Sequence, residues 1–464
     1  MLCAEGCISM NSKTLQKQEL FESDKIIRSI LIMAVPTIIS QVITMIYAYA
    51  DSIYIGIVND PSQIAAIALA QPLNHIMTAS GNFWGVGGGS MISRSLGEHN
   101  YEKLKKASAF SLYGAAAFMI IICLTAFLLG NKLPIWLGAS EAVLPYAYDY
   151  FLYLFIIGGF PAVMSQVMAH LLRAEGYSKE AGFGLMLGGI LNILLDPLFI
   201  FAFGLRLKGA AMATALANII SFCYFVFTYY RLRGSYNASF RLKYLSFKPK
   251  LMIEIFSVGL PAAIIHLMSA ASNLVLNNLL SDFNDFAVAG IGITKKVGQF
   301  PCLVNIGFAQ GSLPLIAYNY AAGNKERMEK LIKKCLMLNI IVGSILMAVL
   351  MIFARPVSSI FIREINTVNY AVLFLRVIGI SAPCFAVCFT TTTVFQAVKK
   401  PITSLLLSLI RKGIIEIPLM ILVASRGIVA VVAIDPIMDY VSGIACIICL
   451  VYFLKHESFR KKKE

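Results

Sequence analysis

Long apolar runs separated by short polar connections fill almost the whole chain. A transmembrane helix needs about 20 predominantly apolar residues, and each run is long enough to supply one. The pattern therefore predicts an all-α polytopic membrane protein with twelve transmembrane helices. The runs fall at about residues 29–56, 62–93, 107–130, 143–171, 181–204, 209–230, 252–280, 285–318, 331–354, 367–395, 402–424 and 427–454.

Composition supports the same fold class. Apolar residues make up 58% of the 464 positions and charged residues only 14%, and the mean hydropathy is +0.77. Soluble globular proteins carry about 25% charged residues, so a soluble enzyme is excluded. Helices of about 20 residues joined by short loops account for the length, and no large soluble domain is expected.

The net charge of +15 reflects where the basic residues lie rather than an acidic partner such as nucleic acid. Most of the 39 Lys and Arg residues fall in every second connection, whereas the intervening connections are short and poor in cations. Cytoplasmic loops carry such an excess of positive charge. We therefore expect a multi-pass protein of the plasma (inner) membrane, with both termini cytoplasmic and no nucleic-acid partner. The basic connections are residues 94–106, 173–179, 231–250, 325–334 and 399–400.

The two halves of the chain form a parallel repeat. The longest polar connection, residues 231–250, separates six apolar runs from six, so both halves enter the membrane from the same side. Such repeats are related by an axis along the membrane normal, enclose a central cavity and alternate access to it. The repeat therefore indicates a transporter. Matching residues recur at a nearly constant offset, as in Pro36 and Pro261, Ser90 and Ser312, Asn100 and Asn324, and Pro161 and Pro383.

This division predicts two pseudo-symmetric six-helix lobes with polar segments around them. The N-terminal lobe is expected at residues 26–231 and the C-terminal lobe at residues 251–455. A cytoplasmic leader is expected at 1–25, a cytoplasmic loop between the lobes at 232–250, and a basic cytoplasmic tail at 456–464.

Two carboxylates, Asp51 and Asp196, lie inside predicted helices of the first half. A charged residue at a helix centre costs about 2.5–3.5 kcal/mol and is usually functional. Asn192 lies one turn before Asp196 on the same face, and Thr214 lies at a similar depth. These four side chains can hold a hard cation such as Na⁺. They could equally hold a proton, since burial and a nearby like charge favour the neutral acid. The alternative is that the carboxylates contact only local backbone, with Asp196 at a kink before Pro197.

The second half carries intramembrane charges of both signs. Lys412 and Glu416 are one turn apart, which favours a neutral internal pair. Lys295 and Arg376 lie near the middle of their spans. We expect these four residues at the substrate cavity, where the cations could receive an acidic or zwitterionic compound. A second pair of acids with the same spacing, at positions 435 and 439, is expected to face other helices.

The sequence Gly-Val-Gly-Gly-Gly-Ser at residues 85–90 is only superficially similar to a phosphate-binding loop. It lacks the Gly-Lys-Ser/Thr ending and the preceding strand, and it lies inside an apolar run. Small residues in such runs allow helices to approach closely, so a packing role is expected. His75, His170 and His266 are isolated in the sequence and are expected to be hydrogen-bonded rather than catalytic.

Several motifs together carry a resemblance to a known family. They are Tyr47-Ala-Tyr-Ala-Asp51, the glycine-rich segment 85–97, Asn192-Ile-Leu-Leu-Asp196-Pro197, Gly259-Leu-Pro261 and Tyr318-Asn-Tyr-Ala-Ala-Gly-Asn324. With these motifs the chain resembles the multidrug and toxic compound extrusion (MATE) family from about residue 26 to residue 454. The resemblance implies two lobes in a V around a central cleft, and secondary antiport of organic, usually cationic, compounds against Na⁺ or H⁺.

The resemblance is to the bacterial branch whose cation site lies in the N-terminal lobe. The positions that match this site are Asp51, Asn192, Asp196 and Thr214. Another bacterial branch has a Glu in span 7 and an Asp in span 10. Here span 7 has no acid after Pro261, and span 10 carries an arginine instead.

We predict a secondary active antiporter that exports cationic, amphipathic drugs or toxins in exchange for Na⁺ or H⁺ by rocking of its two lobes. It is expected to act as a monomer on small molecules in the lipid bilayer, without a cofactor other than the transported ion. The alternative is a flippase for a lipid-linked or other amphipathic precursor, favoured by the cations of the second half. An enzyme is not expected, because Asp196 follows two leucines rather than the Gly-x-Gly of intramembrane aspartyl proteases.

Overall fold

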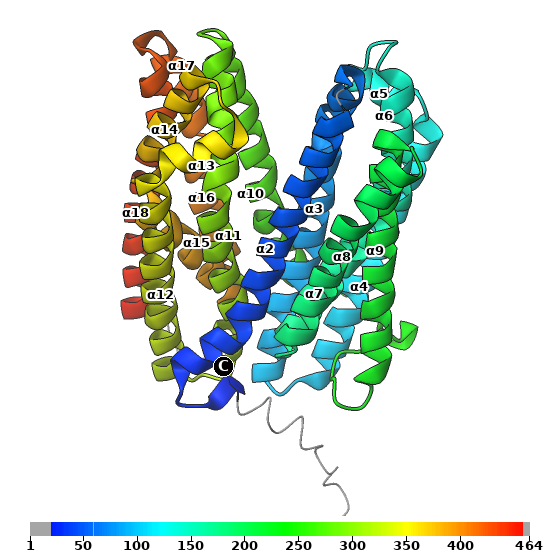
Figure 1. Ribbon diagram of the computed structural model, residues 1–464. Helices are drawn as coiled ribbons and strands as arrows, with labels where there is room; N and C mark the ends of the chain where they lie inside the picture. Colours follow the sequence, from blue (N-terminus) through cyan, green and yellow to red (C-terminus); the bar gives the residue numbers. More distant parts are fainter. Residues whose placement is uncertain (1–19, 59, 458–464) are drawn as a thin grey trace, which may run out of the picture.

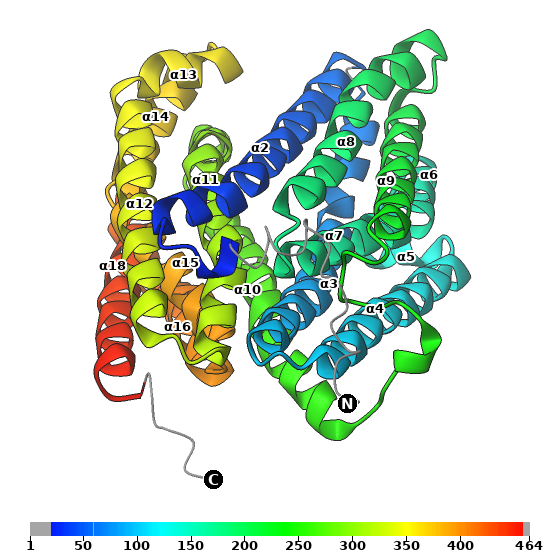
Figure 2. The same ribbon diagram turned by 90° about the horizontal axis from the view of Figure 1, so that it is seen from below.

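The computed structural model describes residues 20–58 and 60–457. Over these ranges the chain is a bundle of helices without a β-sheet, and it divides into two lobes that form a V (Figure 1). Seen from below, the lobes lie side by side (Figure 2). In their contact, α3 packs against α10 and α2 packs against α11. The predicted all-α architecture of two lobes is confirmed.

The first lobe is drawn from blue to green in Figure 1. A π-helical turn joins α6 to α7, so these two helices cross the lobe as one segment. The helices are α2 (Ile26–Val58), α3 (Pro61–Gly97), α4 (Tyr101–Leu129), α5 (Lys132–Trp136), α6 (Leu144–Phe151), α7 (Gly159–Ala174), α8 (Ser178–Pro197) and α9 (Arg206–Arg231).

The second lobe is drawn from green to red. Its helices are α10 (Pro249–Ser281), α11 (Asp285–Ala321), α12 (Lys325–Ile352), α13 (Ala354–Phe361), α14 (Ile365–Gly379), α15 (Ala382–Ala397), α16 (Pro401–Arg411), α17 (Glu416–Val423) and α18 (Ile428–Tyr452). The predicted leader and tail lie mostly outside the described residues.

The expected transmembrane segments are all present as helices. In the described ranges, nine segments are long and apolar enough to cross a membrane alone, and α14 with α15, bent by 53°, makes a tenth. The two other expected spans are α3, which is long but rich in Gly, Ser and Asn, and the pair α16–α17. That pair is interrupted at Gly413, whose φ of 119° is readily available only to glycine.

Equivalent helices of the two lobes begin in the same way, which supports the repeat. The side-chain oxygen of Asn100 caps α4 by accepting the backbone N–H of Lys103 at 3.0 Å. Asn324 caps α12 by accepting the backbone N–H of Arg327 at 3.1 Å. Lengths also match, because α2 and α10 have 33 residues each and α3 and α11 have 37 each.

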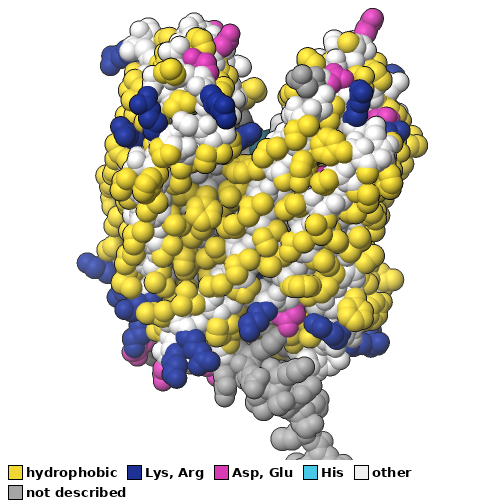
Figure 3. Space-filling model, viewed as in Figure 1, with side chains coloured by type: hydrophobic (Ala, Val, Ile, Leu, Met, Phe, Trp, Pro, Cys, Tyr) yellow, Lys and Arg dark blue, Asp and Glu magenta, His cyan; other side chains and the backbone are white. Residues whose placement is uncertain are grey.

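The outer surface of the molecule is apolar. In Figure 3, hydrophobic side chains cover the sides of both lobes, and charged side chains gather toward the two ends. The same view shows a hollow between the lobes at the upper end. We call this the open end, and we call the opposite end, where α3 ends and α10 begins, the closed end. An apolar band between two polar ends is the surface that a lipid bilayer requires.

The glycine-rich segment 85–90 allows α3 to pack closely on several sides. A Cβ atom on Gly85 would overlap a side chain of α7, and one on Gly87 would overlap the backbone of α10. A Cβ atom on Gly88 would overlap a side chain of α4. The predicted packing role of this segment is therefore confirmed. On the facing helix, a Cβ atom on Gly259 would overlap the carbonyl oxygen of Phe83.

Replacing Gly259 by Ala is expected to destabilise the protein, because the new methyl group has no room beside the α3 backbone. Overpacking of this kind costs about 1–3 kcal/mol. Gly292→Ala is the matched control, since nothing lies within 4 Å of a Cβ there. In a helix interior, alanine is about 0.5–1 kcal/mol better than glycine. Melting temperatures in detergent should therefore fall for Gly259→Ala and not for Gly292→Ala, and equal melting of the two variants would contradict the close approach.

Side chains from both lobes join at the closed end. The hydroxyl of Ser90 donates to the carbonyl oxygen of Gln396 at 2.8 Å, and Arg94 donates to the hydroxyl of Ser90 at 2.7 Å. Four charged residues complete the junction. Lys103 forms ion pairs at 3.3 Å with Glu98 of its own lobe and with Glu254 of the other. Lys399 of the second lobe pairs with Glu254 at 3.5 Å and with Glu98 at 3.9 Å.

Candidate functional site

The four residues predicted as a cation site come together in the first lobe. Asp51 lies on α2, Asn192 and Asp196 lie one turn apart on α8, and Thr214 lies on α9. These helices are neighbours, because α8 packs along both α2 and α9. The i, i+4 spacing on α8 directs both side chains to the same face of the helix.

Asn192 is the centre of this cluster. Its side-chain amide donates to the hydroxyl of Thr214 at 2.8 Å and to a carboxylate oxygen of Asp196 at 3.4 Å. Asp196 is fully buried, with 0% of its surface exposed. Asp51 lies close enough to interact electrostatically with Asp196, so the two carboxylates share one site.

Three oxygen atoms of the cluster have no hydrogen-bond partner among the described residues. They are Oδ1 of Asp51, Oδ1 of Asn192 and Oδ2 of Asp196. Buried polar atoms are nearly always hydrogen-bonded, so three unpartnered acceptors in one place indicate a site for a positive ligand. Carboxylate, amide and hydroxyl oxygens are suitable ligands for a hard cation, and a carboxylate can alternatively take a proton.

Two tyrosines that the sequence did not identify belong to the same site. Tyr47 and Tyr150 both interact electrostatically with Asp51 and Asp196. Tyr47 lies one turn before Asp51 on α2, and this spacing could have revealed it. Tyr150 is buried on α6, far from the others in sequence, and nothing in its local pattern indicates its place.

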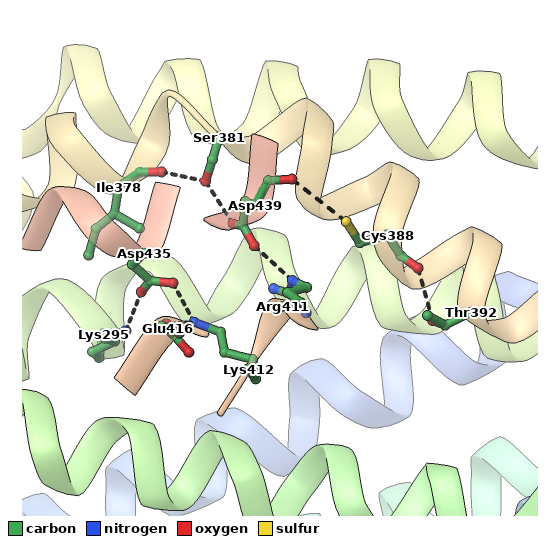
Figure 4. A network of polar contacts seen from close by, with 10 residues as sticks. All are labelled: Lys295, Ile378, Ser381, Cys388, Thr392, Arg411, Lys412, Glu416, Asp435 and Asp439. Carbon is green, nitrogen blue, oxygen red and sulfur yellow. Dashed lines mark hydrogen bonds and ion pairs between the residues drawn. The ribbon is translucent and has the colours of Figure 1, made fainter. Parts of the chain in front are cut away.

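The intramembrane charges of the second lobe form a network of ion pairs (Figure 4). Lys412 lies at the break between α16 and α17 and contacts Glu416 at 2.6 Å. It also contacts Asp435 of α18, and Asp435 accepts a second hydrogen bond from Lys295 of α11 at 2.7 Å. The predicted internal pairing of Lys412 and Glu416 is therefore present.

A second ion pair lies one turn along α18. Arg411 donates to Asp439 at 2.7 Å, and Asp439 also accepts the hydroxyl of Ser381 at 2.8 Å (Figure 4). The guanidinium of Arg411 lies over the rings of Phe385 and Phe389, at 4.5 and 5.5 Å from their centroids. Side-chain exposure of the pair is 9% for Arg411 and 5% for Asp439, so this pair is shielded from solvent.

The structure does not bring the four expected cavity residues around one cavity. Lys412 and Glu416 have side-chain exposures of 12% and 0% and are occupied by each other, and Lys295 is paired with Asp435. Arg376 is exposed on the side of α14, beside apolar residues of α12 such as Ile352. None of the four lines the pocket between the lobes. The expectation is corrected because charges inside an apolar lobe are stabilised most by pairing with one another.

Comparison with protein families agrees with the division of the chain into two lobes. The family model of MatE matches the chain twice, at residues 36–198 and 261–422, once in each lobe. The chain is 29% identical to the multidrug export protein MepA of Staphylococcus aureus (strain NCTC 8325 / PS 47), over 94% of this chain and 95% of MepA. It is also 29% identical to MepA of Staphylococcus saprophyticus, with the same coverage.

Solved structures show the same fold at lower sequence identity. An outward-facing multidrug resistance MATE family transporter of the MOP superfamily superposes with a TM-score of 0.88 at 22% identity, over 94% of this chain and 97% of that one. A mutant of the Vibrio cholerae MATE transporter VcmN gives a TM-score of 0.85 at 21% identity, over 96% of this chain and 99% of that one.

Proposed function

Since this chain belongs to the MatE family, we propose that it is a secondary active antiporter that exports amphipathic organic compounds in exchange for Na⁺ or H⁺. The relatives named as multidrug export proteins support a drug or toxin as the exported compound. Cationic compounds are the class that the family resemblance implies.

The observation that carries the proposal is the group of unpartnered oxygens in the first lobe. Asp51, Asn192 and Asp196 each retain a buried oxygen without a hydrogen-bond partner in the described chain. Na⁺ could be coordinated by these three oxygens, whereas H⁺ would protonate one of the carboxylates, and either ion would reduce the repulsion between the two acids. Coupling requires that the ion bind one conformation of the transporter more tightly than the other.

The shape of the molecule supports alternating access. The lobes are separated at the open end, and they are joined at the closed end by hydrogen bonds and by the ion pairs of Lys103 and Lys399. The basic connections 94–106 and 399–400 lie at the closed end, which supports a cytoplasmic position for this end. In our proposal the structure is the outward-facing state, and opening of the closed end would require the cross-lobe ion pairs to separate.

We also propose that the protein lies in the plasma membrane with both termini in the cytoplasm, as the distribution of basic connections predicts. The chain is proposed to act as a monomer, because all four residues of the candidate cation site come from one chain. No cofactor other than the transported ion is proposed.

Transport in proteoliposomes tests the proposal. The fluorescent cation rhodamine 123 would be loaded into the vesicles, and a Na⁺ gradient or a pH gradient would be imposed separately. We expect one of the two gradients to drive movement of the dye and the other to have little effect. Size-exclusion chromatography and thermal melting would show that the protein is folded. If the folded protein moves no dye under either gradient, the proposed antiport is contradicted.

A further inference from the structure

A pocket between the lobes carries positive charge and contains no acidic residue. It lies at the closed end of the cleft, between α3, α7, α10, α11 and α15, and its cavity volume is about 50 Å³, which suits a small polar group. We call it the apex pocket. Its lining combines apolar side chains such as Val86, Leu313 and Phe389 with polar ones. The polar side chains that matter here are Asn82, His170, Arg173, His266, Gln310 and Gln396.

Arg173 is buried in this pocket without an acidic partner. Only 3% of its surface is exposed, although the sequence placed it in a cytoplasmic loop. Among the described residues, the side chain of Arg173 forms one hydrogen bond, which joins its guanidinium to Nδ1 of His170 at 3.3 Å, and its Nε has no partner. A guanidinium can only donate, so Nδ1 of His170 accepts and the other ring nitrogen carries the proton. His170 therefore adds a donor to the pocket.

The other buried arginine of this region is different. Arg94 is 1% exposed, but it interacts electrostatically with Glu98 and Glu254. No comparable acid acts on Arg173 among the described residues. Glu175, two positions after it, accepts the backbone N–H groups of Asn237 and Ala238 at 2.8 and 2.7 Å, in a connection outside the pocket.

A buried charge without a counter-ion is strongly unfavourable, because removal from water is not offset by a Coulomb attraction. An arginine that only packs in a lobe would be expected to have a carboxylate beside it, as Arg411 has Asp439. The pocket around Arg173 instead offers hydrogen-bond donors and open space. An anionic group would supply the missing charge and accept the unused N–H groups.

We propose that the apex pocket binds the anionic group of an amphipathic organic molecule, with Arg173 as its charge partner. His170, Gln310 and Gln396 line the pocket and can donate hydrogen bonds to this group, and the apolar lining contacts the adjoining part of the molecule. The group is a carboxylate, sulfonate or phosphate. That the bound molecule is exported rests on the function proposed above, whereas its binding does not.

Equilibrium binding to the purified full-length protein tests this site. Carboxyfluorescein and rhodamine 123 share a xanthene ring system and differ in charge, and fluorescence anisotropy follows the binding of each. We expect Arg173→Gln to weaken carboxyfluorescein binding at least about tenfold, as expected for loss of a charged hydrogen bond, and to leave rhodamine 123 binding unchanged. Arg376→Gln is the matched control, because Arg376 is exposed away from the pocket, and it should change neither affinity.

A further variant separates this site from misfolding. Arg173→Lys should retain more carboxyfluorescein binding than Arg173→Gln, because it keeps the positive charge. The proposal is overturned if the wild-type protein does not bind carboxyfluorescein. It is also overturned if Arg173→Gln weakens the binding of both dyes to the same extent. The wild-type measurement decides the question even if the Arg173 variants do not fold.

Competition identifies the source of the anionic group. Phosphatidylglycerol would displace carboxyfluorescein if the pocket accepts a lipid headgroup, whereas phosphatidylcholine serves as the control lipid without net charge. Displacement by phosphatidylglycerol alone assigns the site to an anionic lipid. If neither lipid displaces the dye, the site is assigned to a free organic anion, and both results support the chemistry of the pocket.

Discussion

Asp196→Asn is expected to abolish export driven by an ion gradient while leaving exchange of dye across the membrane without a gradient. Asp196 is the most deeply buried member of the candidate cation site, and Asn192 already donates to one of its oxygens. The amide has the same shape but no charge, so bound Na⁺ loses a carboxylate ligand and a proton has no acceptor of comparable basicity. Loss of an interaction with a charged group is worth about 1.5–3 kcal/mol, or about 10- to 100-fold in ion affinity.

The measurement compares dye accumulation under a gradient with dye exchange between equal concentrations. Asp51→Asn should give the same separation, because Asp51 shares the site. Asp149→Asn is the control, since this acid of the same lobe is 39% exposed and pairs with Lys208 at 3.3 Å near the open end. If Asp196→Asn and Asp51→Asn both retain accumulation at normal protein levels, the assignment of the cation site would have to be abandoned.

Arg411→Gln is expected to cause the largest loss of stability among the charged residues of the second lobe. It would leave Asp439 buried with only the hydroxyl of Ser381 as a side-chain partner. Removing one partner of a buried ion pair costs about 3–5 kcal/mol, because the remaining charge is not compensated. The melting temperature in detergent should therefore fall strongly.

The double variant Arg411→Gln with Asp439→Asn should recover most of this loss, because it removes both charges. Such a cycle isolates the interaction between the two side chains. Glu326→Gln provides a control, since its pairing with Lys330 is exposed and lies outside the apolar region. This variant should melt like the wild type. A double variant as unstable as Arg411→Gln alone would show that the charge pair is not the cause.

Most of the fold follows from patterns that are local in the sequence. Apolar runs of sufficient length predict helices, and their even division by a polar connection predicts two parallel lobes. The positions at which a transmembrane helix bends or breaks could not be located in this way. The bend of 53° between α14 and α15 depends on packing against neighbouring helices, where Tyr440 of α18 donates to the carbonyl oxygen of Ile380 beside the bend. The break at Gly413 is likewise visible only in the structure.

The candidate cation site was predictable for two reasons that do not need a structure. Charges are rare in apolar runs, so Asp51 and Asp196 are conspicuous, and the helical period places Asn192 beside Asp196. Tyr150 could not be found in the same way, because its electrostatic interaction with the two acids depends on packing between helices far apart in the sequence.

The membrane segments, the repeat of the lobes and the two acids of the candidate cation site could all be predicted from the chain, because these properties depend on composition and helical period along one segment. Which charges compensate one another became visible only in the folded molecule. Lys295 meets Asp435 across two helices, Arg376 remains on the outer surface, and Arg173 is buried without an acid. Each outcome depends on how helices are rotated and packed against their neighbours, since burial and Coulomb interactions are set by distances between segments rather than by position within one.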